Sequence, residues 1–312
     1  MRTRKVRTSL GDKIFDVFNI FLMTILIVIV LYPVLNVIAV SFSDALNVGR
    51  GKLTVYPMIS VDGKSRIGIN TEAYTHILKD NTVWIGYRNS IFYSLAATIT
   101  TLLLTSMFAY PLAIRGFALK KPLTIYLAVT MFFSGGLIPT FLLIRNIGWI
   151  NNPLAIIIPG AVGAWNVFIF RTFFQNIPTE LIESAKMDGA NDFTVLFRIV
   201  LPLSTALLAT FGLFGIVGMW NNWFSALIYL PDANLHPLQL ILREYLYVVN
   251  SQQLQARAGM GGGASNPNLI QQLTPRSVQM AMVVVTMFPI MATYPFFQRY
   301  FVKGIMIGAI KG

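Results

Sequence analysis

Long stretches without a charged residue dominate the chain. Six of them contain no Asp, Glu, Lys, Arg or His, and they cover residues 17–43, 89–114, 122–144, 152–170, 199–231 and 277–298. Crossing a hydrocarbon core about 30 Å thick takes about 20 helical residues, so 152–170 is the shortest candidate. The alternating pattern that a membrane β-barrel requires does not occur. The sequence therefore predicts an all-α, polytopic membrane protein with six transmembrane helices.

Composition supports this class and excludes several others. The 312 residues are 55% hydrophobic and 12% charged, whereas about 25% of a soluble protein is charged. Cysteine is absent and histidine occurs twice. A metal site built from Cys thiolates or from several His imidazoles is therefore not expected. The net charge of +12 would indicate a nucleic-acid partner only if basic residues gathered on a soluble face. Here they lie between the apolar runs, so no nucleic-acid partner is expected.

The basic residues predict the orientation instead. With six spans threaded alternately, the segments on the side of the N-terminus carry 14 Lys and Arg, and the longer segments on the other side carry 10. Short loops rich in Lys and Arg stay in the cytoplasm, so both termini are predicted to lie inside. The first run, 17–43, is longer than the apolar core of a signal peptide, about 7–15 residues. It is therefore expected to be a retained helix.

The domain organisation follows from this topology. Residues 1–16 are expected to form a cytoplasmic arm, and 17–312 a single transmembrane domain. An outer loop over 44–88 has a turn signal at Asp62-Gly63, which indicates a small ordered cap.

The second outer loop covers 232–276. It is expected to contain an amphipathic helix around 238–249, followed by a glycine-rich tip that includes Gly261, Gly262 and Gly263. Such a tip is either a flexible linker or a contact for a protein that docks outside.

The six runs contain no ionisable side chain, which bears on mechanism. Ion-coupled carriers usually place one within the membrane, and hydrolysis there would need a general acid, a general base or a metal. An ion-coupled secondary transporter with backbone-carbonyl sodium sites remains the alternative. Seven uncharged residues are candidates for a substrate pathway: Asn89, Trp165, Asn166, Trp220, Asn221, Asn222 and Trp223.

Amides and indoles together suit a neutral sugar. Its hydroxyls can bond to amides while its C–H faces lie on an aromatic ring. The competing interpretation is structural, because Trp marks the bilayer interface and Asn ties helices together. Gly135-Gly136 and Pro139 in the third run are better explained by a broken or closely packed helix than by substrate contact.

The segment 178–202 lies between the fourth and fifth runs, on the predicted inner side. Thr179 is placed to cap a short helix, Gly189 to end it in the left-handed conformation, and Asn191 to start a second helix. Four carboxylates stand against Lys186 alone within 180–192, a local charge of −3 in a chain of +12. This loop is either a solvated face or a surface that docks a partner.

The same segment resembles a known motif. Glu183-Ser184-Ala185, then Gly189, then Ile199, Leu201 and Pro202 match the spacing E-A-A-x3-G-x9-I-x-L-P, the EAA loop of membrane subunits of bacterial ATP-binding-cassette (ABC) importers. Ser184 replaces the middle alanine, a change between small residues. Asp188-Gly189-Ala190, Trp220-Asn221-Asn222-Trp223-Phe224, the phrase 133–139 and the segment 299–304 resemble the carbohydrate-type, MalG-like branch for oligosaccharides.

The resemblance implies a type I ABC importer permease fold in the bacterial cytoplasmic membrane. In that family the loop forms the coupling helix on a separate ATPase, so Glu183, Ser184, Ala185, Asp188, Gly189 and Ala190 are the expected coupling residues. The implied partners are a second homologous permease, two copies of the cytoplasmic ATPase, an extracellular sugar-binding protein and membrane lipid.

The chain itself is expected to be no enzyme and to hold no cofactor. It lacks the G-x-x-x-x-G-K-[ST] loop, so ATP and Mg²⁺ would be bound by the partner ATPase. An ABC permease for a non-sugar solute and a purely structural membrane subunit remain alternatives.

Overall fold

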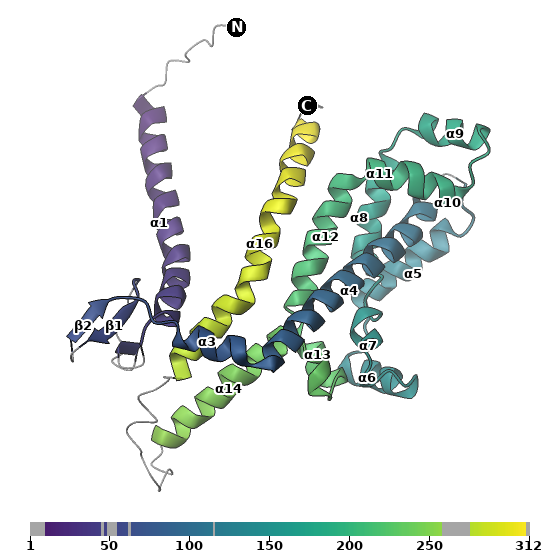
Figure 1. The fold of residues 1–312 in the computed structure, drawn as a ribbon. Helices are drawn as coiled ribbons and strands as arrows, with labels where there is room; N and C mark the ends of the chain where they lie inside the picture. The colour runs from purple at the N-terminus through teal and green to yellow at the C-terminus, as the bar shows by residue number, and fades with distance from the viewer. Residues whose placement is uncertain are drawn as a thin grey trace. The chain divides into compact units, whose positions relative to one another are not determined.

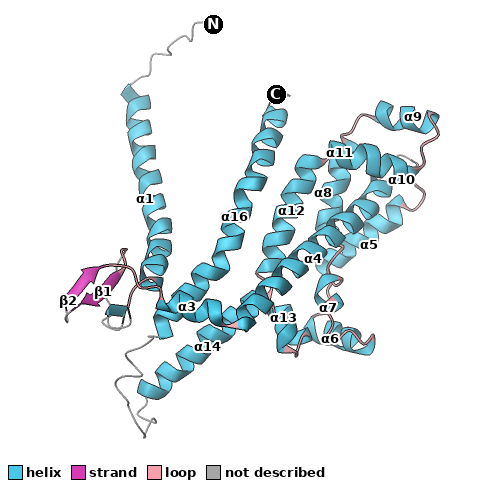
Figure 2. Cartoon of the chain, viewed as in Figure 1, coloured by secondary structure: helices cyan, strands magenta, loops and turns pink. Residues whose placement is uncertain are grey.

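The computed structural model describes residues 10–44, 47–48, 55–61, 64–114, 116–257 and 275–309. The chain divides into two compact units, 1–79 with 245–285, and 80–244 with 286–312. Helices dominate both units (Figures 1 and 2).

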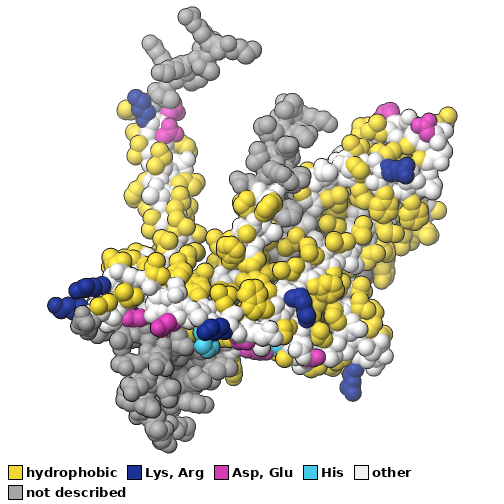
Figure 3. All heavy atoms as spheres, in the orientation of Figure 1, with side chains coloured by type: hydrophobic (Ala, Val, Ile, Leu, Met, Phe, Trp, Pro, Cys, Tyr) yellow, Lys and Arg dark blue, Asp and Glu magenta, His cyan; other side chains and the backbone are white. Residues whose placement is uncertain are grey.

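The first unit begins with a long exposed helix. Helix α1, Leu10–Ser41, contains an apolar window of which none is buried. Hydrophobic side chains cover it along its length (Figure 3). Such a surface is stable only against lipid or another apolar surface. α1 matches the predicted first run, but it begins at Leu10 and therefore includes the end of the predicted arm 1–16.

The described part of the cap predicted after this run contains a β-hairpin, and the predicted turn signal Asp62-Gly63 lies outside the described residues. Strands β1, Met58–Val61, and β2, Lys64–Ile67, pair antiparallel, and α3, Glu72–Lys79, follows. The hairpin is the one departure from all-α structure among the described residues (Figure 2).

Two contacts attach the cap to the end of α1. The backbone N–H of Asp44 donates to the carbonyl oxygen of Met58 at 3.0 Å, and the hydroxyls of Ser41 and Tyr74 are 2.7 Å apart. Burial raises the pKa of Tyr74, although its hydrogen bond with Ser41 acts in the opposite direction. The phenol therefore stays neutral, and able to donate, at physiological pH.

The second unit is built around α4, Asn81–Ala113. The elements that follow along the chain are α5 Lys120–Phe132, α6 Leu137–Asn146, α7 Leu154–Ile157, α8 Ala164–Gln175, α9 Thr179–Met187, α10 Asp192–Val195, the π-helical turn η1 Leu196–Val200, α11 Leu201–Leu203, α12 Thr205–Trp220, α13 Trp223–Tyr229, the 3₁₀ turn η2 Ala233–Leu235, α14 Leu238–Arg257 and α16 Pro275–Ala309. The last two are shared between the units, because α14 belongs to the second unit only up to Glu244 and α16 only from Thr286. α4 packs against α8 and α12. A cluster of buried apolar residues from α4, α8, α10 and α12 forms the core at one end of this unit.

A close approach of backbone holds α4 and α12 together. A Cβ added at Gly215 of α12 would lie 2.8 Å from Oγ1 and 3.0 Å from Cγ2 of Thr98 in α4. Small residues at such crossings let membrane helices pack closely where lipid provides no hydrophobic driving force.

The helices agree only in part with the six predicted spans. In the part of the chain that is described, three helices are long and apolar enough to cross a membrane: α1, α4 and, within α16, Arg276–Phe296. The number rises to five if each of two bent pairs counts as one span. The structure therefore supports several spans, and the count of six remains a prediction.

The third predicted run, 122–144, is not one straight helix. α5 and α6 meet at 116° across a break at residues 133–136. Gly136 has a φ of 80°, which L side chains rarely adopt, and it precedes α6 directly. The break predicted from Gly135-Gly136 is thus confirmed.

The fourth run, 152–170, is not a continuous helix either. It contains the single turn α7, a non-helical stretch over 158–163 and the first part of α8, which continues to Gln175. Pro159, Gly160 and Gly163 lie in that stretch and explain the interruption.

The fifth run, 199–231, divides twice. The pair Asp192–Leu203 and Thr205–Trp220 is bent by 83°, next to Pro202, and α12 ends before Asn221-Asn222. These two asparagines therefore lie at a helix break.

The two predicted outer loops also have different limits. α4 begins at Asn81, so the last residues of 44–88 are helical. The helix predicted around 238–249 is confirmed as α14, which continues to Arg257. Gly261, Gly262 and Gly263 lie outside the described residues.

Candidate functional site

The loop predicted to be functional folds as a short helix with a defined end. α9 covers Thr179–Met187, with Glu180 in its first turn, where a carboxylate interacts favourably with the helix dipole. The predicted cap at Thr179 is wrong, because Pro178 occupies the N-cap position and makes no side-chain bond.

The C-terminus of α9 forms a Schellman motif. Gly189 has a φ of 84°, its N–H donates to the carbonyl oxygen of Lys186 at 3.0 Å, and the N–H of Ala190 donates to that of Ala185 at 2.9 Å. These bonds satisfy two carbonyl groups that the end of the helix leaves open. The left-handed end predicted at Gly189 is confirmed.

A second helix follows at once, as predicted. Asn191 caps α10, since its side-chain oxygen accepts from the backbone N–H of Thr194 at 2.8 Å. Lys186 and Asp192 form an ion pair at 2.9 Å between the two helices. Both side chains are exposed, so the pair contributes little stability but neutralises part of the negative charge of the loop.

α9 has a packed face and an exposed face. Ile182 and Ala185, three residues apart, pack against the core cluster, as does Ala190 after the turn. The other expected coupling residues are exposed: Glu183, Ser184, Asp188 and Gly189. The predicted set therefore divides into residues that hold the helix and residues that present a surface.

Sequence reasoning missed the apolar part of that surface. Met187 is 88% exposed, the highest value among the large exposed hydrophobic residues, and Phe193 is 63% exposed. The helical period gave a usable signal, because it places Met187 away from the face that contains Ile182 and Ala185. Exposed apolar side chains beside carboxylates are typical of a protein interface.

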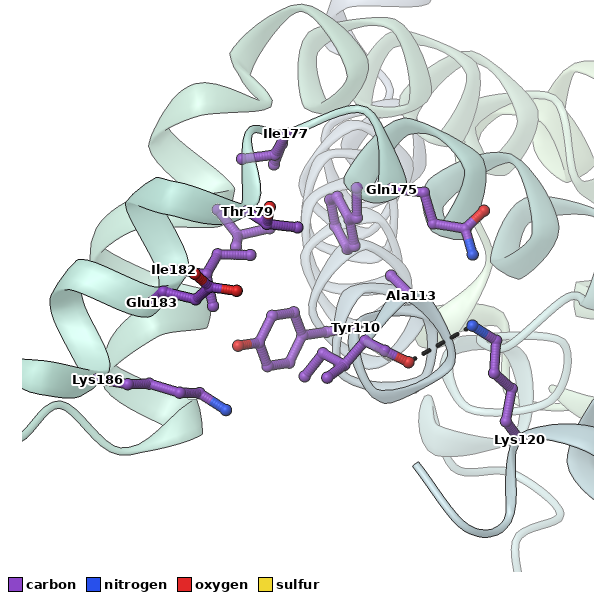
Figure 4. A pocket seen from close by; sticks show the side chains of 12 residues that line it. Tyr110, Ala113, Lys120, Gln175, Ile177, Thr179, Ile182, Glu183 and Lys186 are labelled. Atoms are coloured by element: carbon purple, nitrogen blue, oxygen red, sulfur yellow. Dashed lines mark hydrogen bonds between the residues drawn. The ribbon is translucent and has the colours of Figure 1, made fainter. Parts of the chain in front are cut away.

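A cavity of about 450 Å³ separates α9 from the ends of α4, α5 and α8 (Figure 4). Its polar lining consists of Tyr110, Lys120, Gln175, Thr179, Glu183 and Lys186. Figure 4 shows the Tyr110 ring between the α9 side chains and Lys120, whose Nζ lies 3.4 Å from the carbonyl oxygen of Ile114. α9 is thus held at its ends and by two apolar contacts, with space beneath it.

The second group of predicted residues surrounds the break between α12 and α13. Asn222 caps α13 by accepting from the N–H of Ser225 at 3.2 Å. The amide of Asn221 donates to the carbonyl oxygen of Val217 at 3.0 Å and accepts from Gln239 of α14 at 3.1 Å. The two amides therefore hydrogen-bond to backbone groups at the two helix ends that meet at this break.

The two indoles of this motif have different surroundings. Trp220 is 4% exposed, and its Nε1 donates to the carbonyl oxygen of Thr286 at 3.3 Å. Trp223 is half-buried, and the guanidinium carbon of Arg243 lies 4.6 Å from its ring centroid. Trp220 is engaged in packing, whereas Trp223 has a cation on its face.

The remaining predicted pathway residues are not gathered at one place. Asn89 is buried and donates to the carbonyl oxygens of Asn234 at 2.8 Å and His236 at 3.1 Å. Trp165 is 65% exposed. Asn166 lines a cavity of about 180 Å³ together with Thr101 and Thr105. No group of three or more metal-binding side chains occurs among the described residues.

The described residues thus form a helical bundle with several helices apolar enough to cross a membrane, and α9 is a short exposed helix with acidic and apolar side chains. Residues 83–307 match the family described as "Binding-protein-dependent transport system inner membrane component". The chain belongs to this family. It is an inner-membrane subunit with several spans and no catalytic site, and ATP is bound by its ATPase partner.

Similar proteins support the assignment along nearly the whole chain. The polygalacturonan/rhamnogalacturonan transport system permease protein YtcP of Bacillus subtilis (strain 168) is 34% identical over 96% of this chain and 99% of its own. Protein LplC of the same organism is 34% identical over 97% and 96%. In a crystal structure of a bacterial ABC transporter that imports the acidic polysaccharide alginate, one chain is 29% identical with a TM-score of 0.81, over 95% of this chain and 100% of that one.

Proposed function

We propose that the chain forms half of the translocation pathway of an ATP-driven oligosaccharide importer. Family membership and the saccharides in the names of YtcP and of the alginate transporter support this. The other half would be a second homologous permease, with two copies of a cytoplasmic ATPase and an extracellular sugar-binding protein. The orientation is that of the positive-inside count, with both termini and α9 in the cytoplasm.

The observation that carries the proposal is the two-faced helix α9. Ile182 and Ala185 attach it to the core, while Ser184, Met187 and Asp188 are exposed, and Glu183 is exposed at the edge of the cavity beneath α9. We infer that this exposed face, with Gly189 and Ala190 at the turn, sits on the ATPase. Closing of the ATPase dimer would then displace α9 and shift the permease between inward-open and outward-open populations.

The contacts of the predicted pathway residues reduce the set of candidates for the pathway lining. Asn89 and Trp220 direct their polar atoms to backbone carbonyls inside the unit, which favours a packing role for both. Trp223, Asn221 and Asn222 at the break, with Trp165 and Asn166 on α8, remain the proposed lining. Gly261–Gly263 are proposed to contact the binding protein.

The test is uptake by the purified importer in proteoliposomes. With ATP inside and the loaded binding protein outside, labelled oligogalacturonate should accumulate and should continue to do so with ionophores present. Accumulation that needs an ion gradient and no ATP would instead establish the secondary carrier. ATP hydrolysis without accumulation of any saccharide would contradict the proposed substrate class.

A further inference from the structure

The break between α12 and α13 is in contact with one face of α14. Gln239 and Arg243, one helical turn apart, both reach it: Gln239 donates to Asn221 at 3.1 Å, and Arg243 stacks on Trp223 at 4.6 Å. A guanidinium, an indole and two amides are thereby brought together within the second unit.

Arg243 has no acidic partner among the described residues. The ion pairs found there join Lys186 to Asp192 and His236 to Glu244. Glu244 follows Arg243 directly in the sequence but lies 3.4 Å from the imidazole of His236. Of the 12 Asp and Glu side chains of the chain, Asp62 alone lies outside the described residues. The half-buried guanidinium thus has an aromatic partner and no counter-ion within this part of the chain.

We propose that Arg243, stacked on Trp223, binds the carboxylate of an acidic saccharide at the outer mouth of the pathway. This rests on the proposed function and its orientation, in which the end of α12 faces outward. Guanidinium presents a planar set of donors that matches a carboxylate, and its contact with the indole of Trp223 holds it in place. Asn221 and Gln239 supply hydrogen bonds for hydroxyls. The substrate class is therefore an oligosaccharide that contains uronate.

A neutral sugar would not compensate the charge of Arg243 in the same way. Partial burial of a guanidinium costs solvation free energy, and stacking on tryptophan recovers only part of it. An anionic ligand bound to the guanidinium recovers more, because hydrogen bonds to charged groups are the strong ones.

The competing interpretation is that the stack only attaches α14 to the break. The two roles predict different results for charged and uncharged ligands. If Arg243 only attaches α14 to the break, its loss should affect every substrate equally. Trigalacturonate and its fully methyl-esterified form separate them, since the ester has the same ring number and no charge.

The experiment compares wild type with Arg243→Gln and Arg243→Lys in the complete importer. Arg145→Gln, which removes an exposed arginine at the end of α6, is the matched control. Ligand-induced thermal stabilisation is measured without the binding protein, so that the binding protein's own selectivity does not enter. Uptake with the binding protein is measured in parallel.

We expect Arg243→Gln to weaken trigalacturonate binding and uptake about tenfold or more and to leave binding of the ester unchanged. Arg243→Lys should bind trigalacturonate with an affinity between those of wild type and Arg243→Gln. Arg145→Gln should leave the binding of both ligands unchanged. If Arg243→Gln weakens binding of trigalacturonate and of the ester equally and also lowers the stability of the unliganded protein, the attachment role is established. Undiminished trigalacturonate binding would also overturn the proposal. Absence of any saccharide uptake by wild type would instead overturn the proposed function.

Discussion

The backbone N–H of Ala190 donates to the carbonyl oxygen of Ala185 at 2.9 Å, across the turn at Gly189. Both alanines also pack against the core cluster. The hydrogen bond and the apolar contact fix the direction in which the chain leaves α9, and therefore the angle at which the exposed face of α9 is presented to a partner.

The turn at Gly189 should tolerate only residues that adopt a positive φ. A Cβ there meets nothing within 4 Å, so the backbone conformation is the constraint. Gly189→Val should destabilise the turn by about 1–2 kcal/mol and reduce uptake per ATP hydrolysed, while Gly189→Asn should stay close to wild type. Uptake and ATPase activity are measured together in proteoliposomes. An equal loss in both variants would show that side-chain size at the partner interface is the constraint.

Met187 should anchor the ATPase through its apolar side chain. Burying a methionine contributes about 1.5–3 kcal/mol, so Met187→Glu should weaken ATPase binding about tenfold or more, and Met187→Leu should bind nearly as wild type. Binding is measured with the permease pair in nanodiscs and the purified ATPase. Ile67→Glu, at another exposed apolar residue, in β2, is the control. Unaltered binding by Met187→Glu would place Met187 outside the interface.

Gly215 should be required for the crossing of α4 and α12. Gly215→Ala forces its Cβ against Thr98 and should lower stability by about 1–3 kcal/mol. Gly218→Ala, whose Cβ meets nothing within 4 Å, should change stability by less than about 0.5 kcal/mol. Thermal unfolding in detergent measures both. The double variant Thr98→Ala/Gly215→Ala should recover part of the loss, and failure to do so would mean that the two residues are not coupled.

Asn89 should matter for stability and not for selectivity. Asn89→Ala removes two hydrogen bonds to the carbonyls of Asn234 and His236 and should cost about 1–3 kcal/mol. The ratio of uptake rates for two saccharides should stay unchanged. Asn166→Ala, on α8, is the comparison, because it is expected to change that ratio. A changed ratio for Asn89→Ala at wild-type stability would return Asn89 to the pathway.

Local signals allowed much of this structure to be predicted. The end of α9 at Gly189, the cap at Asn191 and the break at Gly135-Gly136 each depend on a few neighbouring residues. α1 and α14 follow from an apolar run and from an amphipathic period. The family resemblance rests on the same local spacing around Glu183.

The remaining features depend on contacts that are distant in sequence. A charge-free run such as 152–170 can form one continuous helix, or it can form a helical turn, a loop and part of a longer helix. Both structures are apolar, so the sequence does not distinguish them. The two carbonyls bonded by Asn89 belong to residues more than 140 positions away. The stack of Arg243 on Trp223 likewise needs α14 to fold back on the break, which neither residue indicates alone.

The lengths of the packed helices have a consequence for biosynthesis. At about 1.5 Å per residue, the 12 residues of α8 and the 16 of α12 reach about 18 and 24 Å, less than the about 30 Å of the hydrocarbon core. The 33 residues of α4 reach about 50 Å, and α4 packs against both. α4 is also synthesised before either of them. We therefore expect the short helices to integrate beside α4, which is long enough to cross the bilayer and is made first.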